Sequence, residues 1–207
     1  MQLTAKEISE KYDSFARWYD VVEGVPDFLG VKELRRRLLL HAAGKVLEIA
    51  VGTGKNLLHY PKGCQITAVD LSEGMLAVAR KRADELSLTI SFALMDAEKL
   101  GFPDECFDTV VSSLSTCTFP NPVVALKEIA RVCRSEGKIL QLEHGRSDRD
   151  WLGRFQDRHA DRFAKPLGCH WNREPVELAR DAGLKIIKAQ RVFFGIFHQI
   201  EAEPGTA

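Results

Sequence analysis

The sequence predicts an α/β fold of three layers, in which helices cover both faces of a mostly parallel sheet. Short apolar runs alternate with stretches of helical period from residue 45 to residue 143, a pattern typical of strands joined by right-handed helical crossovers. A glycine-bearing turn directly follows the first of these runs. Two further apolar runs meet at Gly195, which predicts a hairpin and therefore one antiparallel strand in the sheet.

Two helices are expected before the first strand. Apolar side chains recur at helical spacing from Leu3 to Tyr19, and a second helical stretch runs from about residue 27 to residue 40. The alternation of strands and helices breaks after residue 145. Residues 149–163 are expected to form an inserted helix, because their aromatic side chains recur at four-residue spacing.

Seven strands and their connecting helices follow from the apolar pattern. Ser72 is expected to cap the helix after the second strand, and Gly183 to end the last helix. The remaining helices are expected at residues 57–60, 73–86, 122–134 and 173–183. The strands are expected at residues 45–50, 65–70, 87–94, 107–113 and 137–143, followed by the hairpin strands at 185–194 and 196–201.

Charge and cysteine content restrict the classes of function. Lys plus Arg and Asp plus Glu both number 29, so no net field draws the chain onto nucleic acid, and no nucleic-acid partner is expected. The five cysteines are odd in number and never spaced as C-x-x-C, which predicts reduced thiols in a cytoplasmic protein. No run approaches the roughly 18 apolar residues of a membrane span, so we expect a soluble protein.

The turn in VLEIAVGTGKN is the most informative stretch, because such a turn lets backbone approach a ligand at the carboxyl edge of a sheet. A dinucleotide fingerprint needs a third glycine where this chain has Leu57. A phosphate-binding P-loop needs glycine at Ile49 and serine or threonine at Asn56. The turn therefore favours neither NAD nor ATP. A glycine turn that serves only the backbone dihedrals stays open as an alternative.

The spacing of Glu48, Ala50, Gly52 and Gly54 resembles motif I of class I S-adenosylmethionine-dependent methyltransferases, with Ala50 where glycine is commoner. Asp70 follows at the end of the second strand, where a carboxylate can accept hydrogen bonds from both ribose hydroxyls. The blocks MDAEKLGFPDECFDTVVSS and RSEGKILQLEH resemble later motifs of the same family. The resemblance implies a Rossmann-like, seven-stranded methyltransferase sheet, with S-adenosyl-L-methionine as cofactor and S-adenosyl-L-homocysteine as product.

The same resemblance implies the site residues. Asp70 would hold the ribose, and Asp96 with Ala97 the adenine. The residues implied to bind the cofactor are Tyr12, Tyr19, Glu48, Ala50, Val51, Gly52, Thr53, Gly54, Asn56, Asp70, Leu71, Met75, Met95, Asp96, Ala97, Ser113 and Leu114. The implied catalytic residues are His144, Ser115 and Tyr19.

His144, at the end of the fifth strand, is the first candidate for a general base, and His170 is the second. A purely structural histidine at this strand end is the alternative. No metal is expected, because the adjacent Cys169 and His170 cannot form a metal site by themselves.

We expect one domain over residues 1–207. Its parts are an N-terminal helical lid (1–40), a cofactor-binding core (41–145), a helical insertion (146–175) and a C-terminal helix with the hairpin (176–207). The segment YDSFARWYDVVEG resembles the lid of UbiE-like quinone-biosynthesis C-methyltransferases, whose aromatic side chains close over the cofactor. An amphipathic helix that only packs on the domain is equally compatible with this segment.

The segments outside the sheet are expected to select the acceptor. Three stretches resemble parts of membrane-associated thiol methyltransferases and bacterial phosphatidylethanolamine N-methyltransferases: LEHG, the expected helix at residues 149–163, and GCHWNRE. We therefore expect a small lipophilic or amphiphilic acceptor: a quinone precursor, a phospholipid amine or a thiol. Residues 149–165 carry aromatic and basic side chains that suit peripheral membrane contact, although a helix that caps the active site fits as well. A binding module without transfer and an RNA methyltransferase are the alternatives, and the oligomeric state stays open.

Overall fold

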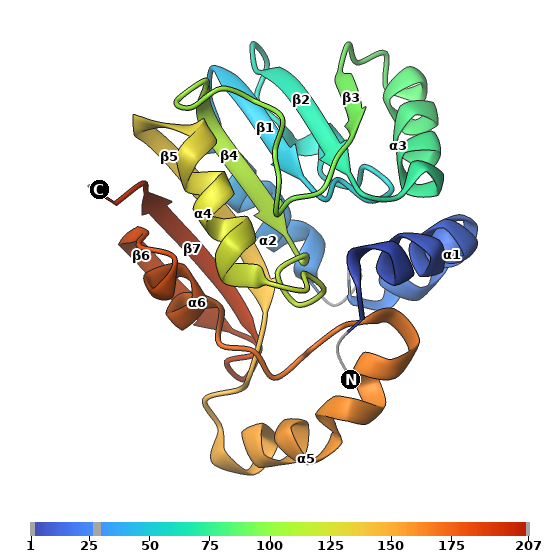
Figure 1. The fold of residues 1–207 in the computed structure, drawn as a ribbon, viewed down its shortest axis with the longest axis vertical. Coiled ribbons are helices and arrows are strands. Elements are labelled where there is room, and N and C mark those ends of the chain that lie inside the picture. The colour runs from blue at the N-terminus through green and yellow to red at the C-terminus, as the bar shows by residue number, and fades with distance from the viewer. Residues whose placement is uncertain (1–2, 27–29, 206–207) are drawn as a thin grey trace.

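The computed structural model describes residues 3–26 and 30–205, and a seven-stranded sheet lies at its centre (Figure 1). The strand order is β3-β2-β1-β4-β5-β7-β6. Strand β7 pairs antiparallel with β5 and β6, and the other pairs are parallel. The strands are β1 (Lys45–Ile49), β2 (Gln65–Asp70), β3 (Ser91–Leu94), β4 (Phe107–Ser113), β5 (Cys133–His144), β6 (Lys185–Val192) and β7 (Phe197–Glu203). The expectation of a mostly parallel sheet with one antiparallel strand is confirmed.

Helices cover both faces of this sheet because the central strands are apolar on both sides. Side chains of β1 alternate between two clusters: Leu47 and Ile49 pack with helices α4 and α6, and Val46 packs with helix α2. The helices are α1 (Ala5–Pro26), α2 (Lys32–Leu39), α3 (Glu73–Glu85), α4 (Pro122–Val132), α5 (Asp150–Leu167) and α6 (Pro175–Asp181). Burial of both faces explains the continuous apolar runs of the core strands.

The strand order reverses at β1, because the chain passes from β1 to β2 and β3 on one side and later to β4 and β5 on the other. At such a switch point the loops after neighbouring strands separate and leave a crevice at the carboxyl edge of the sheet. The loops after β1, β2 and β4 meet there. This edge is where the fold can bind a ligand.

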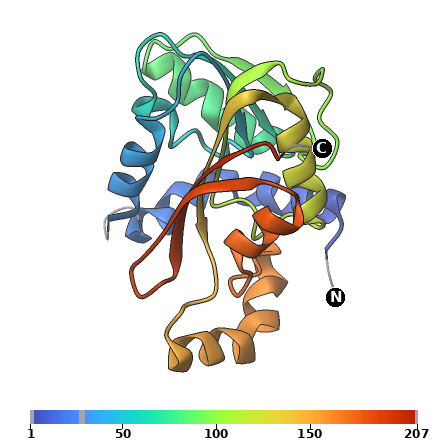
Figure 2. The same cartoon turned by 90° about the vertical axis from the view of Figure 1, so that its left-hand side faces the viewer.

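Two helices outside the sheet flank the same edge. Helix α1 packs against α3 and also contacts α5. Helix α5 is inserted between β5 and α6 and extends beyond the sheet, as Figures 1 and 2 show from two sides. Within residues 3–26 and 30–205, no helix is both long and apolar enough to cross a bilayer.

Several element boundaries differ from the expected ones. Residues 57–60 do not form an α-helix but a short 3-10 turn, η2 (Leu57–His59), because Pro61 forces Tyr60 into an extended conformation with ψ 138°. Strand β3 is shorter and β5 is longer than expected. The expected start of the second helix near residue 27 lies outside the described residues.

Candidate functional site

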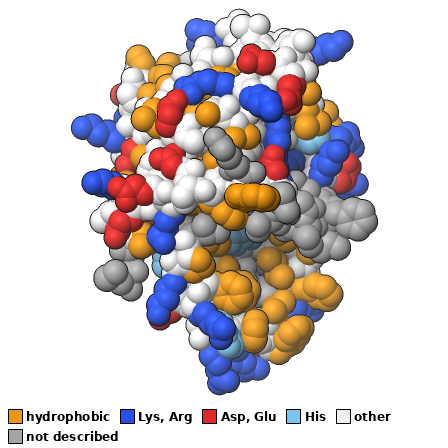
Figure 3. All heavy atoms as spheres, turned by 90° about the vertical axis from the view of Figure 1, so that its right-hand side faces the viewer, with side chains coloured by type: hydrophobic (Ala, Val, Ile, Leu, Met, Phe, Trp, Pro, Cys, Tyr) orange, Lys and Arg blue, Asp and Glu red, His pale blue; other side chains and the backbone are white. Residues whose placement is uncertain are grey.

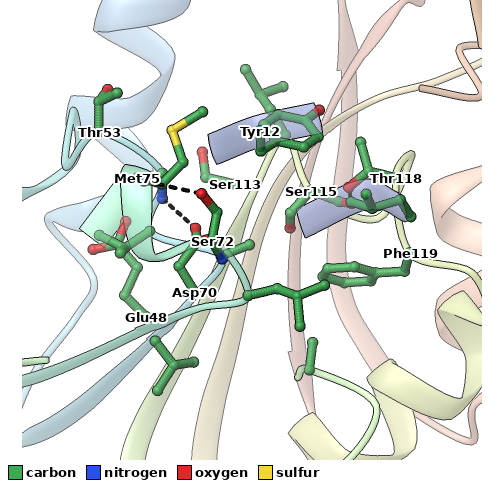
Figure 4. A pocket seen from close by; sticks show the side chains of 18 of the residues that line it. Tyr12, Glu48, Thr53, Asp70, Ser72, Met75, Ser113, Ser115, Thr118 and Phe119 are labelled. Carbon is green, nitrogen blue, oxygen red and sulfur yellow. Dashed lines mark hydrogen bonds between the residues drawn. The ribbon is translucent and has the colours of Figure 1, made fainter. Parts of the chain in front are cut away.

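A pocket with an empty volume of about 960 Å³, open mouth included, lies at the carboxyl edge of β1, β2 and β4 beneath α1. All the residues implied to bind the cofactor line it except Gly54, and Ser115 lines it as well. Figure 4 shows Glu48, Asp70 and Ser72 on one side of the pocket and Ser115 and Phe119 on the other.

The turn after β1 has the backbone that its glycines suggest. Ala50, Gly52 and Gly54 all have positive φ, of 51°, 56° and 78°. A Cβ at Gly52 would meet no atom within 4 Å, so this glycine leaves open space on the pocket side. A Cβ at Gly54 would lie 2.8 Å from Leu57 Cδ1, so Gly54 instead permits close packing inside the turn. The left-handed backbone at Ala50 explains why glycine is commoner at this position in the motif.

Asp70 ends β2 and connects two of the loops. Its carboxylate accepts hydrogen bonds from the backbone N–H of Gly52 at 2.8 Å and of Ser72 at 2.9 Å. Burial raises the pKa of Asp70 to about 6, although these backbone donors oppose the shift. The side chain is 8% exposed and faces the pocket, so it can receive hydroxyl donors from a ligand.

Glu48 lies deeper in the pocket and is 2% exposed. Its carboxylate accepts hydrogen bonds from Asn56 Nδ2 and from the Tyr60 hydroxyl, both at 2.9 Å. Burial raises its pKa to about 7. Arg35 on α2 donates to Asn56 Oδ1 at 3.2 Å and to Ser113 Oγ at 3.0 Å, which links the loop after β1 to the end of β4.

Helix α1 is fixed over the pocket by two acidic side chains. Asp13 accepts hydrogen bonds from Ser72 Oγ at 2.6 Å and from the backbone N–H of Gly74 at 2.8 Å, at the N-terminus of α3. Asp20 accepts from Thr53 Oγ1 at 2.6 Å and pairs with Arg82. Tyr12 and Tyr19 of the same helix line the pocket, and their ring centroids are 6.1 Å apart.

The turn after β4 forms the opposite wall. Leu114 has φ 54°, and buried Glu143 of β5 holds the turn by accepting hydrogen bonds from the backbone N–H of Ser115 at 2.9 Å and of Thr116 at 3.2 Å. Ser112 Oγ also donates to Glu143, at 2.8 Å, and lies 2.7 Å from Ser115 Oγ. The Ser115 hydroxyl is therefore part of a structural network.

His144 does not line the pocket. Its Nε2 lies 3.3 Å from the Sγ of Cys169, on the segment that follows α5. A general-base role for His144 therefore stays a prediction, as do the catalytic roles of Ser115 and Tyr19, which do line the pocket.

Several residues that line the pocket or hold its walls were not anticipated. Arg35 could have been found, because it shares the buried side of α2 with Leu38 and Leu39. Glu143 could also have been found, as a carboxylate within an apolar strand. Further pocket-lining residues outside the expected set are Ile8, Ser9, Lys55, Val69, Ser72, Thr118, Phe119 and Pro120.

Comparison with known proteins decides the family. The profile described as "Methyltransferase domain" matches residues 47–141. A phosphatidylethanolamine N-methyltransferase of Cereibacter sphaeroides is 35% identical over 182 residues, which cover 84% of this chain and 87% of that protein. The chain is a class I S-adenosylmethionine-dependent methyltransferase.

Two further relatives of this methyltransferase have different names. A ubiquinone/menaquinone biosynthesis C-methyltransferase UbiE of Pseudomonas fluorescens is 30% identical over 178 residues, 79% of this chain and 68% of that protein. The mitochondrial methyltransferase OMS1 of Saccharomyces cerevisiae is 29% identical over 215 residues. The match covers 93% of this chain but only 45% of OMS1, so the methyltransferase spans less than half of that relative.

Solved structures agree in fold. The [4+2]-cyclase SpnF has a TM-score of 0.80 at 18% identity, with 100% of this chain and 98% of that chain covered. A methyltransferase of Methanosarcina mazei has a TM-score of 0.67 at 21% identity, with 82% of this chain and 96% of that chain covered.

The cofactor of the present methyltransferase is S-adenosylmethionine. The pocket fits it, because open space at Gly52 and a buried carboxylate at Asp70 lie at the same edge of the sheet.

Proposed function

We propose that this enzyme transfers a methyl group from S-adenosylmethionine to a small lipophilic or amphiphilic acceptor. The observation that carries the proposal is the uneven distribution of charge in the pocket. The charged side chains of the lining come from β1 and the turn after it, from α2, from the end of β2 and from the loop after β3. Across from Glu48 and Asp70, Figure 4 shows the uncharged side chains of Ser115, Thr118 and Phe119. An acceptor with an apolar body suits this wall.

The cofactor would lie along the charged side. Asp70 would receive the ribose hydroxyls, Asp96 with Ala97 would contact the adenine, and Glu48 and Gly52 would shape the methionine end. Bound S-adenosylmethionine supplies an electrophilic methyl on a sulfonium, so the chain mainly has to orient the acceptor and exclude water. The turn after β4, held by Glu143, would present its backbone and Ser115 to the acceptor.

The surface beside the pocket supports an amphiphilic acceptor. Trp151 is 67% exposed, and Phe155 and Phe163 are each 47% exposed on α5. Figure 3 shows hydrophobic side chains gathered on the part of this face where α5 lies, with basic side chains among them. A helix with this composition can rest at a lipid headgroup boundary. We propose that residues 149–165 make peripheral membrane contact in the cytoplasm.

The names of the relatives support the same class of acceptor. One is called a phosphatidylethanolamine N-methyltransferase and another a quinone-biosynthesis C-methyltransferase. The likeness to a [4+2]-cyclase keeps a second function open, since the fold does not determine the reaction. In that second function the chain binds the cofactor without methyl transfer. An RNA acceptor has less support, because the formal net charge is zero.

Transfer of a labelled methyl group tests the proposal. The enzyme is incubated with S-adenosylmethionine labelled in its methyl group and with separate pools of phosphatidylethanolamine, prenylated quinone precursors, small thiols and total RNA. Label is expected in one of the first three pools. Label found only in RNA would contradict the acceptor class, and label in no pool despite cofactor binding would favour the binding module.

The matched variants are Asp70→Ala and Asp84→Ala. Both remove one carboxylate, but Asp70 faces the pocket and Asp84 is exposed on α3. Loss of transfer in the first variant and retention in the second would link the activity to this pocket. Equal rates in both would place the activity elsewhere.

A further inference from the structure

Three side chains from distant parts of the sequence meet just outside the pocket. They are Cys117 in the turn after β4, His144 at the end of β5 and Cys169 after α5. The Sγ of Cys169 lies 3.3 Å from the Nε2 of His144, and all three donor atoms lie within 4.8 Å of one another. None of the three lines the cofactor pocket.

The fold holds this cluster through the backbone. Strands β4 and β5 are neighbours, which brings the turn with Cys117 beside His144. Gly168 ends α5 with φ 72°, and the backbone N–H of His170 then donates to the carbonyl of Cys117 at 2.9 Å. This hydrogen bond fixes the segment with Cys169 against the turn. The cluster is therefore not a chance approach of long side chains.

The donor set suits a particular kind of ion. Two thiols and one imidazole are soft and borderline ligands, and Cys₂His with one open position is a known arrangement for zinc. In a tetrahedral zinc site the S···S separation is about 3.8 Å and the S···N separation about 3.6 Å, from the usual bond lengths. The observed limit of 4.8 Å means that the donor atoms need to move by only about 1 Å.

We propose that Cys117, His144 and Cys169 bind one zinc ion, with the fourth position open to water or a small ligand. Cys117 is buried, and the other two are half-buried, so the ion would be shielded but accessible. The sequence predicted no metal because Cys169 and His170 are adjacent. The structure places Cys169 beside Cys117 and His144, which come from two other segments.

The electrostatic surroundings are compatible with the ion. Arg173 donates to the carbonyls of Thr116 and Phe119, next to Cys117. The two thiolates balance the charge of Zn²⁺ and the imidazole is neutral, so the occupied site would have no net charge. The guanidinium of Arg173 would therefore not repel the bound ion. Bound metal would also occupy His144 Nε2, and this nitrogen could not then act as a general base.

Metal analysis of the full chain tests this site. The protein is purified without chelator, kept reduced and analysed for zinc. It is then stripped of metal and titrated with Co²⁺, with the thiolate-to-cobalt charge-transfer absorption as the signal. One equivalent of metal per chain is expected. Cys117→Ser and Cys169→Ser are each expected to weaken binding more than about 100-fold, since even outer-shell changes cost 10- to 100-fold. Cys64→Ser is the control, because the Cys64 side chain packs against a hydrophobic cluster that contains none of the three proposed ligands.

A second measurement needs no variant. Zinc is expected to protect Cys117 and Cys169, but not Cys64, from alkylation in the wild-type chain, as read by mass spectrometry of peptides. Absence of both the charge-transfer band and the protection would overturn the proposal, as would a band that survives in both serine variants. These readouts report metal binding and not methyl transfer, so failure of this site and failure of the proposed function are distinguishable.

Discussion

At the residue scale, the pocket depends on backbone conformations that most side chains avoid. Ala50 follows β1 with φ 51°, and Leu114 follows β4 with φ 54°. Each left-handed residue costs on the order of 1 kcal/mol, so the surrounding structure must hold it. The backbone N–H of Leu114 donates to Leu142 O at 2.7 Å, and that of Val51 donates to Val69 O at 3.0 Å. The strained residues thus lie where loops after adjacent strands turn into the pocket.

Asp70 should make cofactor binding depend on pH. Because burial raises its pKa to about 6, the carboxylate that receives ribose hydroxyls is mostly ionised at pH 7.5 and mostly protonated at pH 5. The affinity for S-adenosylhomocysteine is expected to fall about tenfold over this interval, as one unit of pH below the pKa implies. Calorimetric titration at several pH values measures it. Asp70→Asn should bind more weakly with a flatter profile, and an unchanged profile in this variant would refute the assignment.

At the element scale, helix α1 is an amphipathic helix as its periodicity predicts, but its role comes from tertiary contacts. Asp13 accepts hydrogen bonds from Ser72 and Gly74, and these contacts join α1 to the start of α3. The sequence pattern could not reveal them, because Asp13 and Gly74 are 61 positions apart. The helical period predicted a helix here, while the polar contacts explain why α1 stays against α3.

Loss of the Asp13 contacts should loosen α1. Asp13→Ala is expected to weaken S-adenosylhomocysteine binding about fivefold, which corresponds to the net value of about 1 kcal/mol for such a hydrogen bond. Limited proteolysis should also cut within α1 sooner. Glu10→Ala, on the exposed side of the same helix, is the control. Equal cleavage rates and affinities in the two variants would argue against a closed lid.

The exposed aromatic side chains of α5 should bind membranes. Replacement of Trp151 and Phe163 by Ser is expected to reduce co-sedimentation with anionic vesicles several-fold, because apolar burial contributes about 25 cal/mol per Å². Ile187→Ser removes a side chain that is 53% exposed on β6 and should have no effect. If all variants sediment equally, α5 is not the membrane contact.

For the molecule as a whole, the sequence predicted the sheet, and most of the residues that the family resemblance implied for the cofactor line one pocket at its carboxyl edge. Parallel strands bring their carboxyl ends to one edge, which explains why Gly52, Asp70 and Asp96 line the same pocket. The strand pattern does not indicate Arg35 and Glu143, because Arg35 of α2 contacts Ser113 at the end of β4 and Glu143 of β5 contacts Ser112 of β4. The cluster of Cys117, His144 and Cys169 could not be predicted for the same reason, since its three members belong to different segments.

The stability of the molecule should also depend on pH through a histidine inside the sheet. Burial lowers the pKa of His198 to about 4, below the unfolded value of about 6.5. Because the folded state holds the ring neutral, the contribution of His198 to the free energy of unfolding is complete above pH 6.5 and is lost as pH falls through 4. This contribution is about 3 kcal/mol, because a shift of one pKa unit corresponds to 1.36 kcal/mol.

Urea unfolding of the wild type and of His198→Phe at pH 7.5 and 4.5 checks this contribution. The free energy of unfolding of the wild type should fall by about 2–3 kcal/mol more than that of the variant. The raised pKa values of Glu48 and Asp70 act in the opposite direction but are common to both proteins. A parallel decline in the two proteins would contradict the role of His198.

In the proposed complex, the turn after β1 and two downstream aspartates surround a single adenosyl group. A crystal structure with bound S-adenosylhomocysteine would show whether they do. We expect both ribose hydroxyls to contact Asp70, the adenine to lie beside Asp96 and Ala97, and the sulfur to point toward the turn after β4. A ligand bound away from Gly52, or one whose ribose does not contact Asp70, would refute this arrangement.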